Sequence, residues 1–237
     1  EGLCAEGVAE EFENYDGMLE AHARGRGVIL CGVHLGSWEP LLRWGPRFGL
    51  PLAGVYRPAH NPLADHIFQK TRGAYGVRWL RGNETASMVS ALADGFVLGM
   101  MTDLNTYSGG VFADFLGLPA SCLAGPAALA LHTGAPLMPA VAVREGDEVT
   151  RIMFGHPLDP SGSVNAQNIA ALTRRINESF EPWILEYAEQ YNWLHPRWRA
   201  RPDGNTWTLA TPDEQIAAAR VDPWPAIPGR LLRILQT

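Results

Sequence analysis

One apolar run that ends in a cluster of polar residues constrains this chain more than any other feature. Residues 28–33 read Val-Ile-Leu-Cys-Gly-Val, a continuous apolar stretch of strand length. Short runs of this kind are typical of strands that are covered on both faces. The sequence His-Leu-Gly-Ser-Trp-Glu follows directly at residues 34–39. The stretch therefore predicts a buried strand of an α/β sheet with polar residues at its carboxyl end.

The polar residues of this stretch suggest a catalytic pair. Gly36 permits a tight turn, Ser37 is expected to cap the next helix, and Pro40 falls in that helix's first turn. His34 then lies at the end of a strand, where open α/β sheets bind ligands. A carboxylate beside an imidazole fixes its tautomer and stabilises the imidazolium. We interpret His34 as a general base and Glu39 as its carboxylate partner. The alternative is that His34 is a polar residue at the end of a strand, and Glu39 an acid in the first turn of a helix, with no catalytic role.

Composition narrows the class of protein. The chain has 237 residues, of which 46% are hydrophobic and 19% charged, enough for a buried core without special staples. Its three cysteines show no C-x-x-C spacing, which argues against a disulfide framework or a zinc site and for a reducing compartment. No metal and no cofactor are expected, and the net charge of −6 gives little support to nucleic-acid binding. No apolar run reaches spanning length, and a chain that opens on Glu1 is expected to be a fragment without its true N-terminus.

Apolar periodicity predicts the order of the elements. Strands are expected at residues 28–33, 52–56, 77–80, 96–101, 138–143 and 149–154, the last two joined by a hairpin-like turn. Helices are expected at residues 37–48, 62–75, 84–94, 123–133 and from 165 toward 191, with a kink or break at Pro182. This alternation predicts an α/β domain over residues 28–202 with a central, mostly parallel sheet flanked by helices. Residues 1–27 are expected to be an N-terminal helical remnant, and residues 203–237 an irregular C-terminal tail.

Further residues can be placed near the same edge of the sheet. Asp103 follows the strand at 96–101, so it repeats the position of His34 at a carboxyl end. The Gly-rich loop expected at residues 104–119 carries Phe112, Phe115 and Leu116, which line an acyl-chain site or pack as ordinary core. Between residues 40 and 81 the only acid is Asp65, whereas the basic residues are Arg43, Arg47, Arg57, Lys70, Arg72, Arg78 and Arg81. This local charge suggests an anionic ligand, an anionic membrane surface or an acidic carrier protein; the alternative is a solvated basic face.

Five blocks of sequence resemble one family. They are residues 34–39, residues 56–62 (Tyr-Arg-Pro-Ala-His-Asn-Pro), Asp103 with residues 110–120, residues 133–136 (Thr-Gly-Ala-Pro) and residues 193–198 (Trp-Leu-His-Pro-Arg-Trp). In this order and spacing they resemble the bacterial lipid A biosynthesis (lauroyl/myristoyl) acyltransferases, within the glycerophosphate and lysophospholipid acyltransferase superfamily. The resemblance covers residues 28–202 and implies a glycerol-3-phosphate acyltransferase-like fold.

The resemblance also implies an activity and a location. It implies a His-x4-Glu catalytic pair at His34 and Glu39, with Arg57 and Asn61 in the binding cleft and with Arg72 and Asp103 close to that pair. A thioester of acyl carrier protein or coenzyme A would donate a fatty acyl chain to a hydroxyl of an anionic glycolipid, without a covalent acyl-enzyme. The protein would lie peripherally on the cytoplasmic face of the bacterial inner membrane, anchored by a missing N-terminal segment.

The sequence also bears on other functions. Acylation of a phosphatidylinositol mannoside or another lysolipid is the alternative reaction, and a non-catalytic lipid-binding homologue is the alternative class. A serine hydrolase has little support because no Gly-x-Ser-x-Gly elbow occurs and capping already explains Ser37. A cysteine nucleophile would be Cys31 or Cys122. It is disfavoured because Cys31 falls inside an apolar strand, where a thiol is inert.

Overall fold

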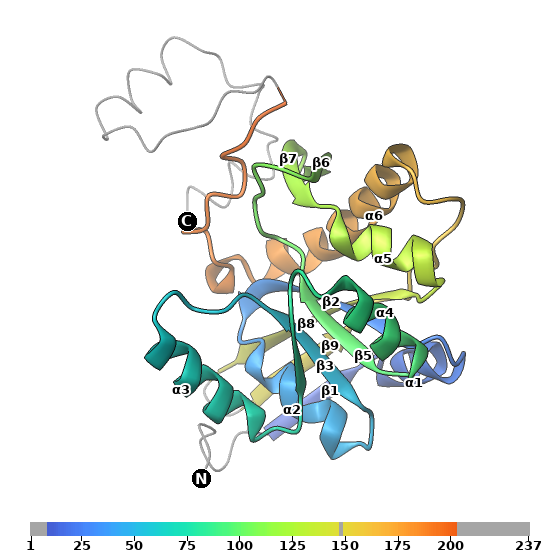
Figure 1. Cartoon of the computed structure of the whole chain (residues 1–237). Coiled ribbons are helices and arrows are strands. Elements are labelled where there is room, and N and C mark those ends of the chain that lie inside the picture. Colours follow the sequence, from blue (N-terminus) through green and yellow to red (C-terminus); the bar gives the residue numbers. More distant parts are fainter. Residues whose placement is uncertain (1–8, 147–148, 203–237) are drawn as a thin grey trace.

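A seven-stranded sheet forms the centre of the protein (Figure 1). The computed structural model describes residues 9–146 and 149–202. The strand order is β1-β9-β8-β2-β5-β3-β4, and every neighbouring pair is parallel except β8 and β9. Helices cover both faces of this sheet (Figure 1). The predicted α/β class, with a mostly parallel central sheet flanked by helices, is confirmed.

The elements follow the expected alternation closely. The sheet contains β1 (Ala9–Glu13), β2 (Val28–Gly36), β3 (Leu52–Tyr56), β4 (Arg78–Arg81), β5 (Val97–Met101), β8 (Leu137–Glu145) and β9 (Val149–Phe154). A separate antiparallel hairpin is formed by β6 (Gly110–Phe115) and β7 (Leu118–Leu123). The helices are α1 (Tyr15–Ala23), α2 (Glu39–Arg47), α3 (Pro62–Gly73), α4 (Thr85–Ala93), α5 (Gly125–Thr133) and α6 (Ala166–Glu186), followed by the 3-10 turn η1 (Ala188–Gln190).

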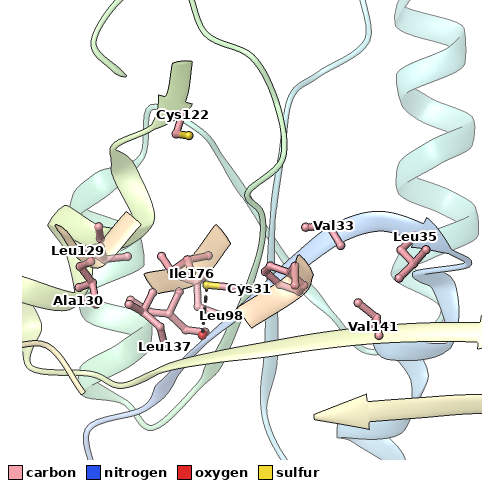
Figure 2. Packing of buried hydrophobic residues seen from close by; sticks show 14 of the residues in the cluster. Cys31, Val33, Leu35, Leu98, Cys122, Leu129, Ala130, Leu137, Val141 and Ile176 are labelled. Atoms are coloured by element: carbon pink, nitrogen blue, oxygen red, sulfur yellow. Dashed lines mark hydrogen bonds between the residues drawn. The ribbon is translucent and has the colours of Figure 1, made fainter. Parts of the chain in front are cut away.

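Strand β2 lies between β5 and β8 and is buried along most of its length. Its alternate residues pack in two separate hydrophobic cores, because successive side chains of a strand point to opposite faces of the sheet. Cys31 and Val33 pack on the face of α4, α5 and α6, where Figure 2 shows Cys31 beside Leu98 and Ile176. Leu30 packs on the opposite face, with side chains of α1 and α2. This double burial explains why the stretch reads as a continuous apolar run.

Two segments differ from the sequence expectation. Residues 9–13, expected within a helical N-terminal remnant, form the strand β1 and pair in parallel with β9, while α1 follows as a helix. Ala-Glu-Glu-Phe-Glu is polar because it forms an edge strand, and an edge strand has little apolar signal. Residues 110–123, expected largely as a loop, form the β6–β7 hairpin. Its turn at Leu116 and Gly117 uses positive φ angles of 52° and 79°, a conformation that propensity alone does not predict.

Helix termini were predicted with mixed success. Asn61 and Asn165 cap α3 and α6, and each side chain accepts a hydrogen bond from a helical N–H. Ser37 does not cap α2, which begins at Glu39, two residues later than expected, with Trp38 at its N-cap position. Pro182 lies inside α6 and does not end it, because the helix continues to Glu186. The tail at residues 203–237 lies outside the described residues.

Candidate active site

His34 and Asp103 meet at the carboxyl edge of the sheet. The register of β2 and β5 sets Gly32 opposite Met101, so the residues two places further along each chain lie close together. The Nδ1 atom of His34 is 2.8 Å from Oδ1 of Asp103. The backbone N–H of His34 donates to Oδ2 of the same carboxylate, also at 2.8 Å. Asp103 therefore fixes both the ring and the backbone of the histidine.

This contact determines what the imidazole can do. The Asp103 side chain is 1% exposed and that of His34 is 28% exposed, so one is sealed in the protein and the other is accessible. A carboxylate facing Nδ1 keeps the proton on that nitrogen and leaves Nε2 as the basic atom. The hydrogen bond and the negative charge of Asp103 raise the pKa of His34, although burial opposes them. A raised pKa makes Nε2 a stronger base.

Glu39, the predicted partner of His34, is engaged elsewhere. Its carboxylate accepts a hydrogen bond from Arg72 at 2.7 Å and one from the hydroxyl of Ser37 at 3.3 Å. The expected hydrogen bond from His34 to a carboxylate is made to Asp103 instead. The physical reason is that β2 extends to Gly36, so His34 belongs to the strand and faces its neighbour β5. Glu39 lies beyond the turn, in the first turn of α2.

Arg72 is held by more than an ion pair. Its guanidinium lies 4.2 Å from the centre of the Trp38 ring and 4.3 Å from that of Phe68. Phe68 in turn stacks on Tyr56, with ring centres 5.3 Å apart. Cation–π contacts on two rings and the carboxylate of Glu39 together fix the direction of this cation. The guanidinium of Arg72 is therefore a fixed positive charge beside the first turn of α2.

A cavity of about 200 Å³ extends from His34 along the face of the sheet that carries α2 and α3. Its floor includes Gly32, Gly54 and Gly99, one glycine from each of three neighbouring strands. Glycines leave space where side chains would otherwise fill it. The other lining residues are mostly apolar: Leu30, Trp38, Leu41, Leu42, Leu52, Ala53, Val55, Tyr56, Phe68, Trp79, Met100 and Met101, together with His34, Arg57 and Arg72. An apolar cavity that begins at an imidazole suits a ligand with a hydrocarbon chain.

The remaining predicted residues divide into two groups. Arg57 lines the cavity, is exposed, and has no ion-pair partner among the described residues. Asn61 does not line the cavity, because its side chain caps α3 by accepting the N–H of Leu63 at 2.9 Å. Arg43 and Arg47 of the basic segment are both paired with Glu10, each at 2.9 Å. Within the described residues, no group of three or more His, Cys, Asp or Glu side chains is placed to hold a metal ion.

The aromatic residues expected at an acyl-chain site lie elsewhere. Phe115 and Leu116 are 1% and 6% exposed and belong to the core beneath α6, whereas Phe112 is 42% exposed. None of the three lines the cavity beside His34, and Phe115 and Leu116 pack in the core, which was the second alternative. Trp38 also lines the cavity, and no motif in the sequence singles it out. Phe68 and Arg72 are one helical turn apart on α3, which places them on the same face toward the cavity.

Comparison with known proteins identifies the family. The family model described as "Bacterial lipid A biosynthesis acyltransferase" matches residues 8–200. This chain belongs to that family, as the five sequence blocks predicted.

Individual relatives show the range of named activities. The chain is 31% identical over 191 residues to a lipid A biosynthesis lauroyltransferase of Escherichia coli (strain K12), a match that covers 78% of this chain and 60% of the relative. It is 28% identical over 206 residues to a palmitoleoyltransferase of the same organism, covering 83% and 63%. It is 27% identical over 190 residues to a phosphatidylinositol mannoside acyltransferase of Mycolicibacterium smegmatis, covering 78% and 61%. The matches thus span 60–63% of the length of these relatives.

One solved structure is also similar. The 1-acyl-sn-glycerophosphate acyltransferase PlsC from Thermotoga maritima aligns with a TM-score of 0.43 and 13% identity, over 72% of this chain and 70% of that one. No helix in the described part of this chain has the length and apolarity that crossing a bilayer requires.

Proposed function

We propose that this protein transfers a fatty acyl chain from a thioester donor to a hydroxyl of an anionic glycolipid, with His34 as the general base. The observation that carries the proposal is the His34–Asp103 hydrogen bond at 2.8 Å, made at the mouth of an apolar cavity. Family membership supports acyl transfer as the reaction class. Histidine suits this task because its ordinary pKa lies near 6.5 and a positioned base contributes about 10²- to 10⁴-fold to the rate.

The reaction follows from the protonation state of the imidazole. Nε2 of His34 takes the proton of the acceptor hydroxyl while the hydroxyl oxygen attacks the thioester carbonyl. Asp103 stabilises the imidazolium that forms, because its carboxylate is already hydrogen-bonded to Nδ1. The imidazolium then returns the proton to the departing thiolate as the tetrahedral intermediate collapses. The acyl carbon exchanges a sulfur for an oxygen, and the enzyme returns to its starting state.

Arg72 is the best-placed cation for the negative charge of this reaction. Its position between two aromatic rings leaves its guanidinium fixed at the cavity wall. It would stabilise the oxyanion of the intermediate or bind a phosphate group of either substrate. Arg57, which lines the same cavity, is the second candidate for a phosphate. Glu39 holds Arg72 in place, so its carboxylate serves the site through that cation.

Direct transfer is favoured over an acyl-enzyme intermediate. The hydroxyl of Ser37 donates to Glu39, a carboxylate already paired with Arg72, and not to the imidazole that would activate a serine nucleophile. Burial raises the pKa of the Cys31 thiol, and its side chain is fully buried in the core. Cys122 is buried as well. None of these nucleophiles is both activated and accessible.

The outer face of α3 supports contact with a membrane surface. Leu63 and Ile67 are 65% and 56% exposed, and Lys70 lies on the same face because residues three and four places apart are neighbours on a helix. We call these three residues the α3 outer stripe. The inner face of the same helix contributes Phe68 and Arg72 to the cavity. A bilayer contacting the stripe would therefore hold lipid substrates next to the cavity.

Acyl transfer of this kind has two candidate acceptors and two candidate donor carriers. A lipid A precursor is the first candidate acceptor, because relatives in this family are named for lipid A biosynthesis. A phosphatidylinositol mannoside is the second, favoured by the match to the mycobacterial relative. Acyl carrier protein and coenzyme A are the candidate donor carriers. Peripheral attachment to the cytoplasmic face of the inner membrane is the location that such substrates require.

An acyl-transfer assay tests the proposal. The purified protein is incubated with lauroyl-acyl carrier protein or lauroyl-coenzyme A and either acceptor, and the lipid products are analysed by mass spectrometry. We expect transfer by the wild type and a loss of about 10²-fold or more in His34→Ala. His132→Ala is the matched control, because His132 is an exposed histidine on α5. A folded His34→Ala variant that matches His132→Ala, or a folded wild type that acylates neither lipid, overturns the proposal.

A further inference from the structure

The segment after α6 returns to the strand that carries His34. Tyr191 forms an isolated antiparallel bridge with Leu35, and the N–H of Asn192 donates to the carbonyl of His34 at 2.9 Å. The side chain of Tyr191 is 6% exposed. Its ring packs against Phe115 and Trp193, with ring centres 6.2 and 4.8 Å away. Backbone and ring contacts therefore fix the direction of the Tyr191 hydroxyl.

That hydroxyl points at the carboxylate which holds the proposed base. It donates to Oδ2 of Asp103 at 3.3 Å. Oδ2 also accepts the backbone N–H of His34, and Oδ1 accepts the imidazole. Asp103 thus receives three hydrogen bonds while 1% exposed, which meets the requirement that a buried charge be well hydrogen-bonded. Two of the donors belong to His34 and the third is Tyr191.

The titratable and charged neighbours leave Tyr191 as a permanent donor. Burial and the charge of Asp103 raise the pKa of the Tyr191 phenol, so it stays protonated. His195 accepts the N–H of Asn105 at Nε2 and burial lowers its pKa, so it stays neutral at pH 7. Arg197 is 1% exposed and donates to the carbonyl of Ser121 and the sulfur of Cys122. On the cavity side, the charged residues that line the cavity with His34 are Arg57 and Arg72.

We propose that Tyr191 is a positioning residue for acyl transfer, acting on His34 through the carboxylate of Asp103. Its hydroxyl keeps Oδ2 in place, so that Oδ1 remains aligned with Nδ1 of the imidazole. Its O–H dipole also offsets part of the carboxylate's negative potential at His34. Tyr191 is not among the residues that line the cavity, so we assign it to the base rather than to the binding site. This role rests on the proposed function of His34.

The first test is a titration of the His34 ring by NMR in the wild type and in Tyr191→Phe. Removing the O–H dipole leaves the carboxylate more negative toward the imidazole, so the pKa of His34 is expected to rise. The matched control is Tyr187→Phe, which removes a hydroxyl that donates to another carboxylate, that of Glu145, at 3.2 Å. The control should leave the titration of His34 unmoved. A pKa of His34 that falls or stays unmoved in Tyr191→Phe overturns the proposal.

The second test asks whether the effect passes through Asp103. In the Asp103→Asn background the Tyr191→Phe change should no longer move the titration of His34. In the acyl-transfer assay, Tyr191→Phe should lower kcat by about threefold to tenfold and leave KM unchanged. An equal shift in the Asp103→Asn background, or a change in KM alone, shows a structural or binding role and overturns the proposal.

A substitution that keeps the ring covers the case in which Tyr191→Phe fails to fold. 3,5-Difluorotyrosine at position 191 retains the packing and has a more acidic hydroxyl, which is a stronger donor. It should lower the pKa of His34, the direction opposite to that of Tyr191→Phe, and a shift upward or no shift overturns the proposal. A wild type that transfers no acyl group overturns the proposed function and this role with it, whereas an unmoved titration in an active enzyme overturns the role of Tyr191 alone.

Discussion

The sequence offers two carboxylates, Glu39 and Asp103, as possible partners of His34. The fold pairs His34 with Asp103, which is the more distant of the two along the chain. Glu39 is five residues away along the chain, whereas Asp103 is separated by 69 residues. Parallel pairing of β2 with β5 makes the distant residue the spatial neighbour. The nearer carboxylate then serves a cation instead, since Arg72 needs a partner at the cavity wall. The two acids thus have separate partners: Asp103 holds the proposed base, and Glu39 holds the guanidinium of Arg72.

Replacing Arg72 with lysine tests the task given to this cation. Lysine keeps the charge but loses the planar group that lies between Trp38 and Phe68. We expect Arg72→Lys to lower kcat/KM by about tenfold. The melting temperature should change little, because a partly exposed ion pair stabilises a protein only weakly. Arg81→Lys, at the exposed end of β4, is the control, and equal activity of the two variants in the transfer assay would show that the planar group has no function.

At the scale of elements, the end of β2 depends on close approach to β8. The register between these strands shifts between Gly32 and Gly36, and the N–H of Ser37 donates to the carbonyl of Ala142 at 2.9 Å. A Cβ at Gly36 would overlap the same carbonyl oxygen, and the φ angle there is +61°. Glycine is therefore required for both conformation and space. The shifted register carries the chain from the strand into the turn before α2.

Two glycine-to-alanine variants separate these effects. Gly36→Ala adds a clash to the backbone strain, whereas Gly49→Ala, at φ +75° with no atom within 4 Å of its Cβ, adds strain alone. We expect losses in the free energy of unfolding of about 1 kcal/mol for Gly49→Ala and about 2–4 kcal/mol for Gly36→Ala. Urea denaturation measures both. Equal losses would mean that the approach of β8 leaves room for a side chain.

The elements show where sequence reasoning succeeds. The strand at 52–56 was predicted with its observed bounds, because an apolar run between Gly/Pro signals has no strong competitor. The strand β1 was missed because its stabilisation comes from pairing with β9, which is 140 residues away in the chain. Asp103 was placed near His34 but not as its partner, since spacing along a chain carries no information on strand order. No sequence motif marks Tyr191. It comes close to Asp103 only because the chain returns to β2 after α6.

At the scale of the molecule, the proposed reaction requires that a lipid substrate and a water-soluble acyl donor meet at one edge of the sheet. Helix α3 stands at the outside of the protein (Figure 1), and none of its residues is buried. Its inner face closes the cavity, and its α3 outer stripe presents two large apolar side chains and a lysine to solvent. Apolar side chains beside a cation favour an anionic lipid surface.

Vesicle binding tests the α3 outer stripe. Changing Leu63 and Ile67 to aspartate should reduce cosedimentation with phosphatidylglycerol vesicles by about tenfold or more, because apolar contact is lost and negative charge is added. Binding by the wild type should weaken with added salt and with neutral phosphatidylcholine vesicles. A control that adds the same charge changes Leu19 and Val164, which are 38% and 50% exposed on other parts of the surface. Equal losses of vesicle binding in both double variants would show that the α3 outer stripe is not a specific membrane contact.

The most direct test of the account compares the pH dependence of kcat/KM in Asp103→Asn and Glu39→Gln. The base is active when deprotonated, so activity rises as pH increases through the pKa of His34, which Asp103 raises above its ordinary value. Asp103→Asn removes that stabilisation, so the acidic limb should move to lower pH while the plateau falls by about 10²-fold or more. Glu39→Gln should leave the limb in place and lower the activity less. A limb that moves in Glu39→Gln and stays fixed in Asp103→Asn would contradict the assignment of Asp103 as the partner of the base.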